Sequence, residues 1–322
     1  MTEFLAYSIQ YRRLLMRFPL GPGPYRDRLL DAMAWLLVDL HRSGVFWGDC
    51  SLANTLFRRD GDKIQAFLVD AETSEIHDSL SDGQRTYDLD ILVENVAFGL
   101  ADLAALQNRE HESEDAIEAA ETVRARYAAV WDEISLEPEL SPDDRHAIRA
   151  RVRRLNDLGF AVDEIALEPS ADGDGAVRLR VAVANRRFHV RKLERLTGLV
   201  GLEGQARLLL NDLEEYRAWL EYHEARRLDD TEAAERWLRE VLEPALASLV
   251  PAIGPLRDPL QAYCDVLEEK WILSEMAGGD VGLEAAKDAY IGLGAPAPET
   301  SEEGDSSIVL DIDWSTALDA DA

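Results

Sequence analysis

The stretch from residue 44 to residue 60 reads GVFWGDCSLANTLFRRD, and it decides how the first third of the chain folds. A short apolar run leads to Asp49, and Asn54 follows on the same loop before a second apolar run begins. Farther along, the segment AFLVDAET carries Asp70 at the end of another apolar run. Two strand-like runs that each end near an Asp, with an Asn between them, call for a chemical explanation.

Regular elements are predicted on both sides of this stretch. Leucines recur on one face of residues 25–43, which predicts a helix, and Gly44 follows where a helix C-cap glycine belongs. The Asp-Gly pair of FRRDGDK lies between two apolar runs and predicts a hairpin turn. Residues 87–106 are apolar enough to form a buried helix.

The rest of the chain has a more helical pattern. Residues 111–157 predict two helices, and Ser141 followed by Pro142 is an N-cap signature for the second. Residues 160–186 predict two strands around a turn rich in Gly and Asp. Residues 189–292 predict further amphipathic helices, in which Trp219, Trp237 and Trp271 are expected to belong to the core rather than to a ligand cage.

The expected fold class is therefore α+β and mainly helical. A length of 322 residues is enough for two ordinary domains. The boundaries predicted are an α/β region over residues 1–110, a mostly helical region with a hairpin over residues 111–292, and a tail over residues 293–322. The tail is rich in Pro, Ser and acidic residues, which predicts disorder.

Composition restricts the partners and the compartment. The formal net charge of −29 repels phosphate backbones and disfavours free nucleic acid as a partner; the arginine-rich segment 145–155 is only a local exception. No apolar run is long enough to span a bilayer, and the N-terminus has no signal-peptide pattern. Cys50 and Cys264 lie far apart without metal-ligand spacing, so we expect a reduced, cytoplasmic chain.

Asp49, Asn54 and Asp70 each have a chemical reason to be present in phosphoryl transfer. One Asp accepts or orients the proton of an acceptor hydroxyl, which is the role expected of Asp49. The side-chain oxygens of Asn54 and Asp70 are hard ligands of the kind that Mg²⁺ prefers, and the ion completes its shell with water and phosphate. The spacing lets the side chains of Asp49 and Asn54 converge from one loop.

This order of residues resembles the C-terminal lobe of the protein-kinase-like superfamily, closest to its small-molecule and lipopolysaccharide-kinase branches. The segments LHRSGVFWGDCSLANTLF and FLVDAET carry the resemblance, which covers about residues 1–110. The chain also resembles a bacterial family labelled domain of unknown function 4032, which pairs a lipopolysaccharide-kinase-like part with a helical C-terminal domain. That wider resemblance includes EKWILSEMAGGDVGLEAA and runs to about residue 292.

The kinase resemblance implies a role for each site residue. Asp49 would be the catalytic-loop Asp, and Asn54 and Asp70 would hold Mg²⁺ and the ATP that it accompanies. Asp88, in RTYDLDILVEN, would hydrogen-bond the backbone of the catalytic loop and fix its shape. An ordinary helix N-cap is the alternative role for Asp88.

The chain also departs from the kinase pattern. Trp47 and Gly48 stand where many protein kinases have His and Arg, and Ala71-Glu72 replaces Phe-Gly after the metal-binding Asp. Only 48 residues precede Asp49, and none of them is a lysine. The sequence therefore begins where an N-terminal lobe with a Gly-rich loop would end, and two explanations stay open: either the start was assigned too late, or the chain lacks the lobe. If it lacks the lobe, ATP would have half a site, and we would expect weak or no turnover.

Two functions remain open at this point. The first is a Mg²⁺/ATP-dependent phosphotransferase acting on a hydroxyl of a small molecule, sugar or lipid. The alternative is a pseudokinase-like scaffold that binds a protein partner through its helical C-terminal domain. Two neighbouring side chains are expected to be structural in either case: His41 packs at a helix end, and Cys50 is a small buried residue.

Overall fold

The computed structural model describes residues 5–12, 23–106, 113–140, 144–169, 177–183, 186–255 and 257–295. The order of elements confirms the predicted α+β, mainly helical class. The predicted turn at 170–176, the Ser141-Pro142 pair and the predicted tail beyond residue 295 lie outside the described residues. Among the residues described, none of the helices has the length and apolar character needed to cross a bilayer.

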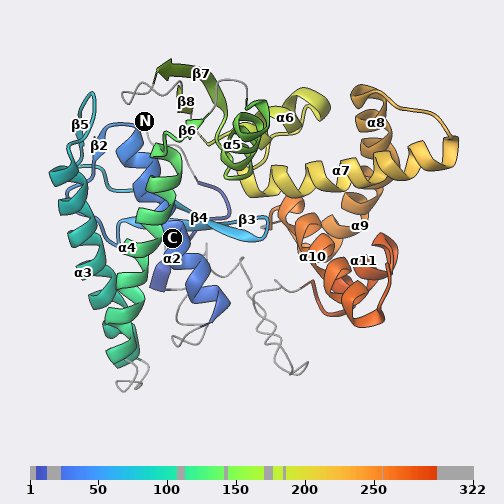
Figure 1. Ribbon diagram of the computed structural model, residues 1–322. Helices are drawn as coiled ribbons and strands as arrows, with labels where there is room; N and C mark the ends of the chain where they lie inside the picture. Colours follow the sequence, from blue (N-terminus) through green and yellow to red (C-terminus); the bar gives the residue numbers. More distant parts are fainter. Residues whose placement is uncertain are drawn as a thin grey trace.

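Among the residues described, the first region contains short strands and the long helices α2, α3 and α4 (Figure 1). In chain order these are β1 (Ile9–Gln10), α2 (Pro24–Arg42), β2 (Val45–Phe46), β3 (Thr55–Asp60), β4 (Lys63–Leu68), β5 (Glu75–Ile76), α3 (Asp82–Leu106) and α4 (Ser113–Ser135). The turn at Gly61 joins β3 and β4 as an antiparallel hairpin, and β1 pairs with the other edge of β3. The predicted helix and the predicted hairpin are thus both present.

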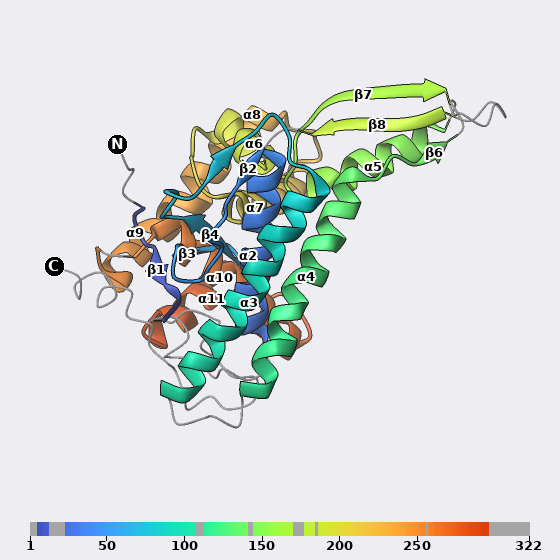
Figure 2. The same cartoon turned by 90° about the vertical axis from the view of Figure 1, so that its left-hand side faces the viewer.

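Helix α4 packs with the first region. Figure 2 shows α3 and α4 running side by side, with α2 behind them. Buried side chains of α4, including Val123 and Tyr127, belong to the same apolar core as Leu37, Phe57 and Leu92. This core therefore extends past residue 110, where the sequence places the boundary. Periodicity identifies an amphipathic helix but carries no information about which core receives its apolar face.

The middle of the chain forms an extended arm. It consists of β6 (Glu139–Leu140), α5 (Arg145–Asp157), β7 (Val162–Pro169) and β8 (Val177–Val183), with strand order β6-β8-β7. Figure 2 shows β7 and β8 projecting away from the body. The hairpin agrees with the prediction, whereas β6 was not predicted. The described N-cap of α5 is Asp144, whose side chain accepts a hydrogen bond from the Ala147 N–H at 2.9 Å.

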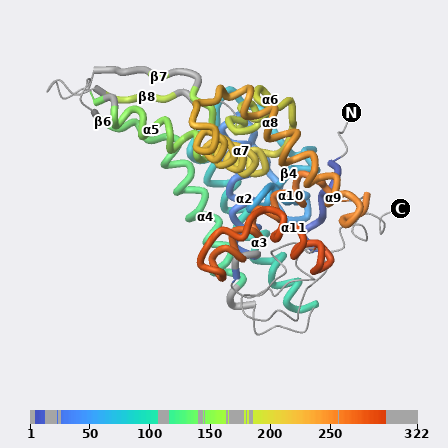
Figure 3. Tube along the Cα trace, turned by 90° about the vertical axis from the view of Figure 1, so that its right-hand side faces the viewer, coloured from blue at the N-terminus to red at the C-terminus, as the bar shows by residue number. Residues whose placement is uncertain are grey.

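The last region is a helical bundle with its own core (Figure 3). It contains α6 (Phe188–Thr197), α7 (Glu203–Glu224), α8 (Asp230–Trp237), the π-helical turn η2 (Leu238–Leu242), α9 (Glu243–Ile253), α10 (Pro259–Ala277) and α11 (Leu283–Gly292). Trp237 is fully buried there and donates to Asp212, as expected of a core residue. The same expectation is wrong for Trp219 and Trp271, which are 54% and 61% exposed.

The tip of the β3–β4 hairpin joins the two cores. The N–H of Gly61 donates to the Gln261 side chain at 2.8 Å, and Gln261 donates back to the Gly61 carbonyl at 2.9 Å. Asp60 accepts a hydrogen bond at 2.8 Å from the backbone N–H of Gln205, in the first turn of α7. One end of the hairpin therefore adjoins the loop that precedes β3, and the other end, the turn at Gly61, makes a buried contact with the helical bundle.

Candidate functional site

The loop between β2 and β3 brings Asp49 and Asn54 together. The Asn54 side-chain nitrogen donates to the Asp49 carboxylate at 2.8 Å and is 3.3 Å from the Asp49 carbonyl. The Ser51 hydroxyl oxygen accepts a hydrogen bond from the Asn54 N–H at 3.2 Å, which closes the turn. Asp49 is exposed. The loop thus presents a carboxylate to solvent, held by its neighbouring amide.

Asp70 lies at the same end of the hairpin. Thr55 pairs with Leu68 in the β3–β4 ladder, and the Val69 N–H donates to the Asn54 carbonyl at 3.1 Å. Asp70 is the next residue, so its backbone adjoins the loop that carries Asn54. It is exposed, and one of its carboxylate oxygens accepts from the Glu72 N–H at 3.3 Å.

Asp88 supports the loop from beneath. Its carboxylate accepts hydrogen bonds from the backbone N–H groups of Trp47 at 2.6 Å and Gly48 at 2.8 Å. The side chain is fully buried, and its residue lies in the second turn of α3 rather than at its start. The N-cap alternative for Asp88 is therefore wrong. Ser81 and Gln84 make the reciprocal hydrogen bonds of a capping box instead.

Two further side chains extend this support, and sequence reasoning missed one of them. The His41 ring lies with Nε2 3.1 Å from the Asp88 carboxylate and Nδ1 2.8 Å from the Tyr127 hydroxyl. Both residues are buried, and burial raises the pKa of Tyr127. Tyr127 comes from α4, 86 residues after His41, and no local pattern in the sequence marks that pairing.

Two of the residues that depart from the kinase pattern, Trp47 and Gly48, have structural reasons to be present. Trp47 is fully buried, and its carbonyl accepts a hydrogen bond from the Thr73 hydroxyl at 3.1 Å. Gly48 has φ of 79°, and a Cβ atom there would lie 3.1 Å from the Thr73 carbonyl oxygen. A glycine suits this tight, left-handed position better than a larger residue would.

Cys50, next to Asp49, is structural rather than reactive. It is fully buried, and burial raises the pKa of its thiol, which keeps the thiolate form rare. Its carbonyl accepts a hydrogen bond from the Asn95 side chain at 2.8 Å. This hydrogen bond connects the loop to α3.

Side-chain oxygen donors are present at this end of the hairpin. Two carboxylates and one amide oxygen are available from Asp49, Asp70 and Asn54. Across the residues described, no group of three or more His, Cys, Asp or Glu side chains is arranged to hold a metal ion. Mg²⁺ commonly binds one or two carboxylates and takes its remaining ligands from water and phosphate.

Comparison with protein families found a match. The family model described as "Domain of unknown function (DUF4032)" matches residues 129–293, which is just over half of the chain. It begins within α4 and covers the arm and the helical bundle, but not the loop with Asp49 and Asn54. Neither the curated proteins nor the solved structures gave a match. Because this family model matches more than half of the chain, the chain belongs to the family of proteins that contain the domain of unknown function DUF4032.

Proposed function

We propose that the chain is a kinase-like protein derived from a Mg²⁺/ATP-dependent phosphotransferase that acts on a hydroxyl of a small molecule, sugar or lipid. One observation supports the proposal: Asp49 and Asn54 are hydrogen-bonded to each other on the loop before β3, and the buried Asp88 accepts from two backbone N–H groups of that loop. Asp70 follows β4 at the same end of the hairpin. The side-chain oxygens of Asp49, Asn54 and Asp70 are suitable cation ligands. The hydrogen bonds from the loop to Asp88 favour a fixed loop conformation, as a binding site requires.

Each residue has a distinct part in this proposal. Asp49 is exposed and accepts the proton of the acceptor hydroxyl or orients that hydroxyl. Asn54 and Asp70 provide the protein oxygens for the cation. Mg²⁺, when bound, supplies positive charge against the nucleotide phosphates.

The supporting residues limit motion at the site. Asn54 holds the Asp49 carboxylate at 2.8 Å, and Asp88 fixes the two N–H groups that precede Asp49. Positioning is the main contribution that a protein makes to phosphoryl transfer, because the chemistry itself needs little covalent participation. A loop held from both sides meets that requirement.

The test is Mg²⁺-dependent release of labelled γ-phosphate from ATP, with water as the acceptor. We expect the wild-type chain to turn over weakly and Asp49→Ala to lower that rate about 100-fold, because a positioned general base contributes at least that much. The variant should keep the wild-type unfolding midpoint, since Asp49 is exposed. Glu72→Gln, an exposed carboxylate two residues beyond Asp70, is the matched control and should turn over at the wild-type rate. Equal rates of ATP turnover by wild type and Asp49→Ala would show that Asp49 takes no part in phosphoryl transfer.

A second function, a scaffold for a protein partner, is favoured by one specific observation. Large apolar side chains are exposed toward the C-terminal ends of α7 and α10, among them Trp219, Tyr222, Trp271 and Met276. Exposed aromatic side chains of this size are common at protein interfaces. A scaffold keeps its cellular function in Asp49→Ala and loses it in the double variant Trp219→Ser/Trp271→Ser, whereas an enzyme shows the opposite pattern.

A further inference from the structure

The helices α2, α3 and α4 contribute a series of polar side chains that lies beneath the loop carrying Asp49. Figure 2 shows α3 and α4 side by side with α2 behind them, and this arrangement lets side chains from all of them meet. The series runs from the start of α3 through α4 and the end of α2 and back to α3, and its members are Arg85, Tyr127, His41 and Asp88.

The contact between His41 and Asp88 places a proton on one ring nitrogen. Nε2 of His41 lies 3.1 Å from the Asp88 carboxylate. The same carboxylate accepts hydrogen bonds from the backbone N–H groups of Trp47 and Gly48, at 2.6 and 2.8 Å. Because an ionised carboxylate only accepts hydrogen bonds, His41 donates through Nε2–H. In a neutral imidazole the other ring nitrogen, Nδ1, is then an acceptor.

The Tyr127 hydroxyl faces Nδ1 of His41 at 2.8 Å. Burial raises the pKa of Tyr127, and Arg85 opposes that rise both as a positive charge and as a hydrogen-bond donor. Arginine has no acceptor atom, so the Tyr127 oxygen accepts from Arg85 and the hydroxyl proton is directed to Nδ1. If Nδ1 carried a proton instead, the hydroxyl proton would have no acceptor among the residues described.

Arg85 is itself held in place by its neighbours. It donates to the Leu80 carbonyl at 3.1 Å and to the Asp82 carboxylate at 2.6 Å. Its guanidinium carbon lies 4.3 Å from the centre of the Trp131 ring, a cation–π distance. Trp131 in turn stacks on Tyr127, with the ring centres 5.7 Å apart. These contacts keep the Arg85 guanidinium beside the Tyr127 hydroxyl.

We propose that Arg85 and Tyr127 are positioning residues that hold the ring proton of His41 on Nε2. The Asp88 carboxylate is then kept in place beneath the loop, because each donor from Arg85 onward has an acceptor. Hydrogen bonds in a buried series strengthen one another, so the loss of one weakens the others. A part for these residues in catalysis rests on the proposed function, whereas their effect on the loop does not.

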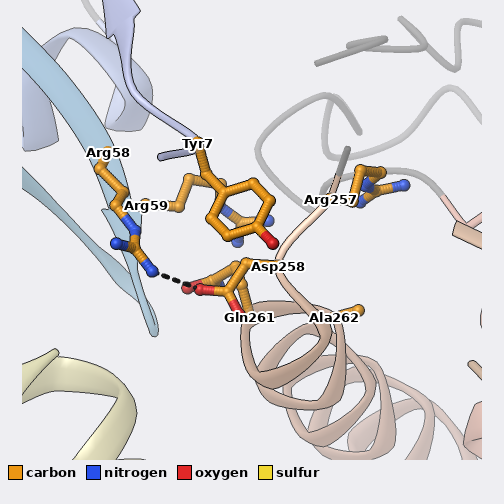
Figure 4. Close-up of a pocket in the computed structure, with 7 residues that line it drawn as sticks. All are labelled: Tyr7, Arg58, Arg59, Arg257, Asp258, Gln261 and Ala262. Atoms are coloured by element: carbon orange, nitrogen blue, oxygen red, sulfur yellow. Dashed lines mark hydrogen bonds and ion pairs between the residues drawn. The ribbon is translucent and has the colours of Figure 1, made fainter. Parts of the chain in front are cut away.

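An arginine and a tyrosine also meet in a pocket near the start of α10, which Figure 4 shows. There the Arg58 guanidinium carbon lies 5.4 Å from the centre of the Tyr7 ring, and Arg58 pairs directly with Asp258 at 2.7 Å. No histidine is among the described side chains that line this pocket. Arg58 thus ends in its own ion pair, whereas Arg85 is connected to the loop through a tyrosine and a histidine.

The experiment locates the His41 proton by ¹⁵N NMR of the full chain labelled in histidine, with the His41 signals assigned from their loss in His41→Gln. We expect well-separated shifts for the two ring nitrogens of His41 in wild type, because only Nε2 carries a proton. In Tyr127→Phe, Nδ1 has no donor and is free to take a proton, which the neighbouring Asp88 carboxylate favours. The two shifts should therefore converge.

Hydrogen exchange followed by mass spectrometry gives a second readout, at the loop itself. The backbone N–H groups of Trp47 and Gly48 lie in the segment 45–50. Exchange in this segment should become about tenfold faster in Tyr127→Phe, which is the effect of losing one buried hydrogen bond of the series.

Tyr263→Phe is the matched control. Tyr263 is buried in the other core, and its hydroxyl donates to Asp212 at 2.6 Å, so this variant loses a buried hydrogen bond outside the series. It should keep the wild-type His41 shifts and the wild-type exchange rate in residues 45–50. Arg85→Gln, which changes the more exposed end of the series, gives a second reading if Tyr127→Phe does not fold, and its His41 shifts should also converge.

Nearly equal ring-nitrogen shifts for His41 in the folded wild-type chain would overturn the proposal. Unchanged His41 shifts in the folded variants Tyr127→Phe and Arg85→Gln, or equal changes in Tyr263→Phe, would do the same. Neither readout uses ATP, so a failure of the wild-type chain to release phosphate from ATP counts against the proposed function alone.

Discussion

At the scale of single residues, Asp88 is the side chain on which the loop most depends. It accepts from two backbone N–H groups and lies 3.1 Å from the His41 ring, all without exposure to solvent. Asp88→Ala leaves these donors buried and unpaired, and we expect it to lower the free energy of unfolding by about 3 kcal/mol. Urea denaturation measures this directly.

Asp90→Ala is the matched control for that substitution. Asp90 lies on the same helix but is exposed, and its ion pair with Arg124, at 2.9 Å, is at the surface. Exposed ion pairs contribute less than about 1 kcal/mol. A similar loss of stability in the two variants would show that Asp88 does not support the loop.

The sequence alone accounts for some of these residues and not for others. Asp49 and Asn54 are five positions apart, and a loop of that length can turn both side chains toward each other, which is where the structure puts them. The partners of Asp88 are different, because His41 and Asp88 are 47 residues apart and nothing in a single sequence reports such a contact. The capping box of Ser81 and Gln84 was a readable signal, and it would have placed the start of α3 before Asp88.

At the scale of elements, the β3–β4 hairpin connects the candidate site to the helical bundle. Its turn could be predicted from Asp60-Gly61, but what the turn touches could not, because that depends on α7, which lies more than 140 residues later in the chain. A Cβ atom on Gly61 would lie 2.8 Å from the carbonyl carbon of Gly204, within the first turn of α7. A shift of the α7 backbone away from this Cβ atom would break the hydrogen bond between Asp60 and the Gln205 N–H.

We therefore expect Gly61→Ala to destabilise the chain by about 2 kcal/mol more than Gly198→Ala does. Gly198 has a similar left-handed φ, 74° against 64°, but nothing lies within 4 Å of a Cβ atom added there. Gly198→Ala should therefore show the cost of the left-handed backbone conformation, about 1 kcal/mol, without a clash between the added Cβ atom and a neighbouring backbone. Chemical denaturation of both variants measures the difference, and equal losses would mean that the hairpin tip is not held against α7.

At the scale of the whole molecule, the buried Asp60 makes the stability of the junction depend on pH. Burial raises its pKa above the ordinary value of 3.8, against the lowering effect of the Gly204 and Gln205 N–H groups. The folded chain then holds a proton that the unfolded chain has lost. The contribution of Asp60 to stability is therefore fully present below its ordinary pKa of 3.8 and is lost as pH rises from there through the raised pKa.

Asp60→Asn tests this contribution, because an amide oxygen can accept the same backbone hydrogen bonds without ionising. We expect the free energy of unfolding of the variant, relative to wild type, to increase as pH rises above 3.8, the ordinary pKa of the Asp side chain, in the direction that the raised pKa of Asp60 requires. Urea midpoints at several pH values measure it. A difference that stays constant with pH would contradict a raised pKa for Asp60.

The domain organisation could be predicted only in part from the sequence. The change from an α/β pattern to a helical one is visible in the sequence, and two apolar cores are present. The assignment of α4 to the first core was not readable, since its apolar face is compatible with either core. The family match from residue 129 also begins inside α4, so the helix belongs partly to the matched segment and packs with the part that precedes it.

The most direct test of the central claim is calorimetric titration of ATP into the folded chain, with and without Mg²⁺. Three proteins are compared: wild type, Asp70→Asn, which weakens one proposed cation ligand, and Glu72→Gln, its exposed neighbour. The account predicts Mg²⁺-dependent binding by wild type and Glu72→Gln, and binding at least about tenfold weaker by Asp70→Asn, in line with the loss of one charged ligand. Absence of ATP binding by wild type with Mg²⁺ present, or equal binding by Asp70→Asn, would contradict it.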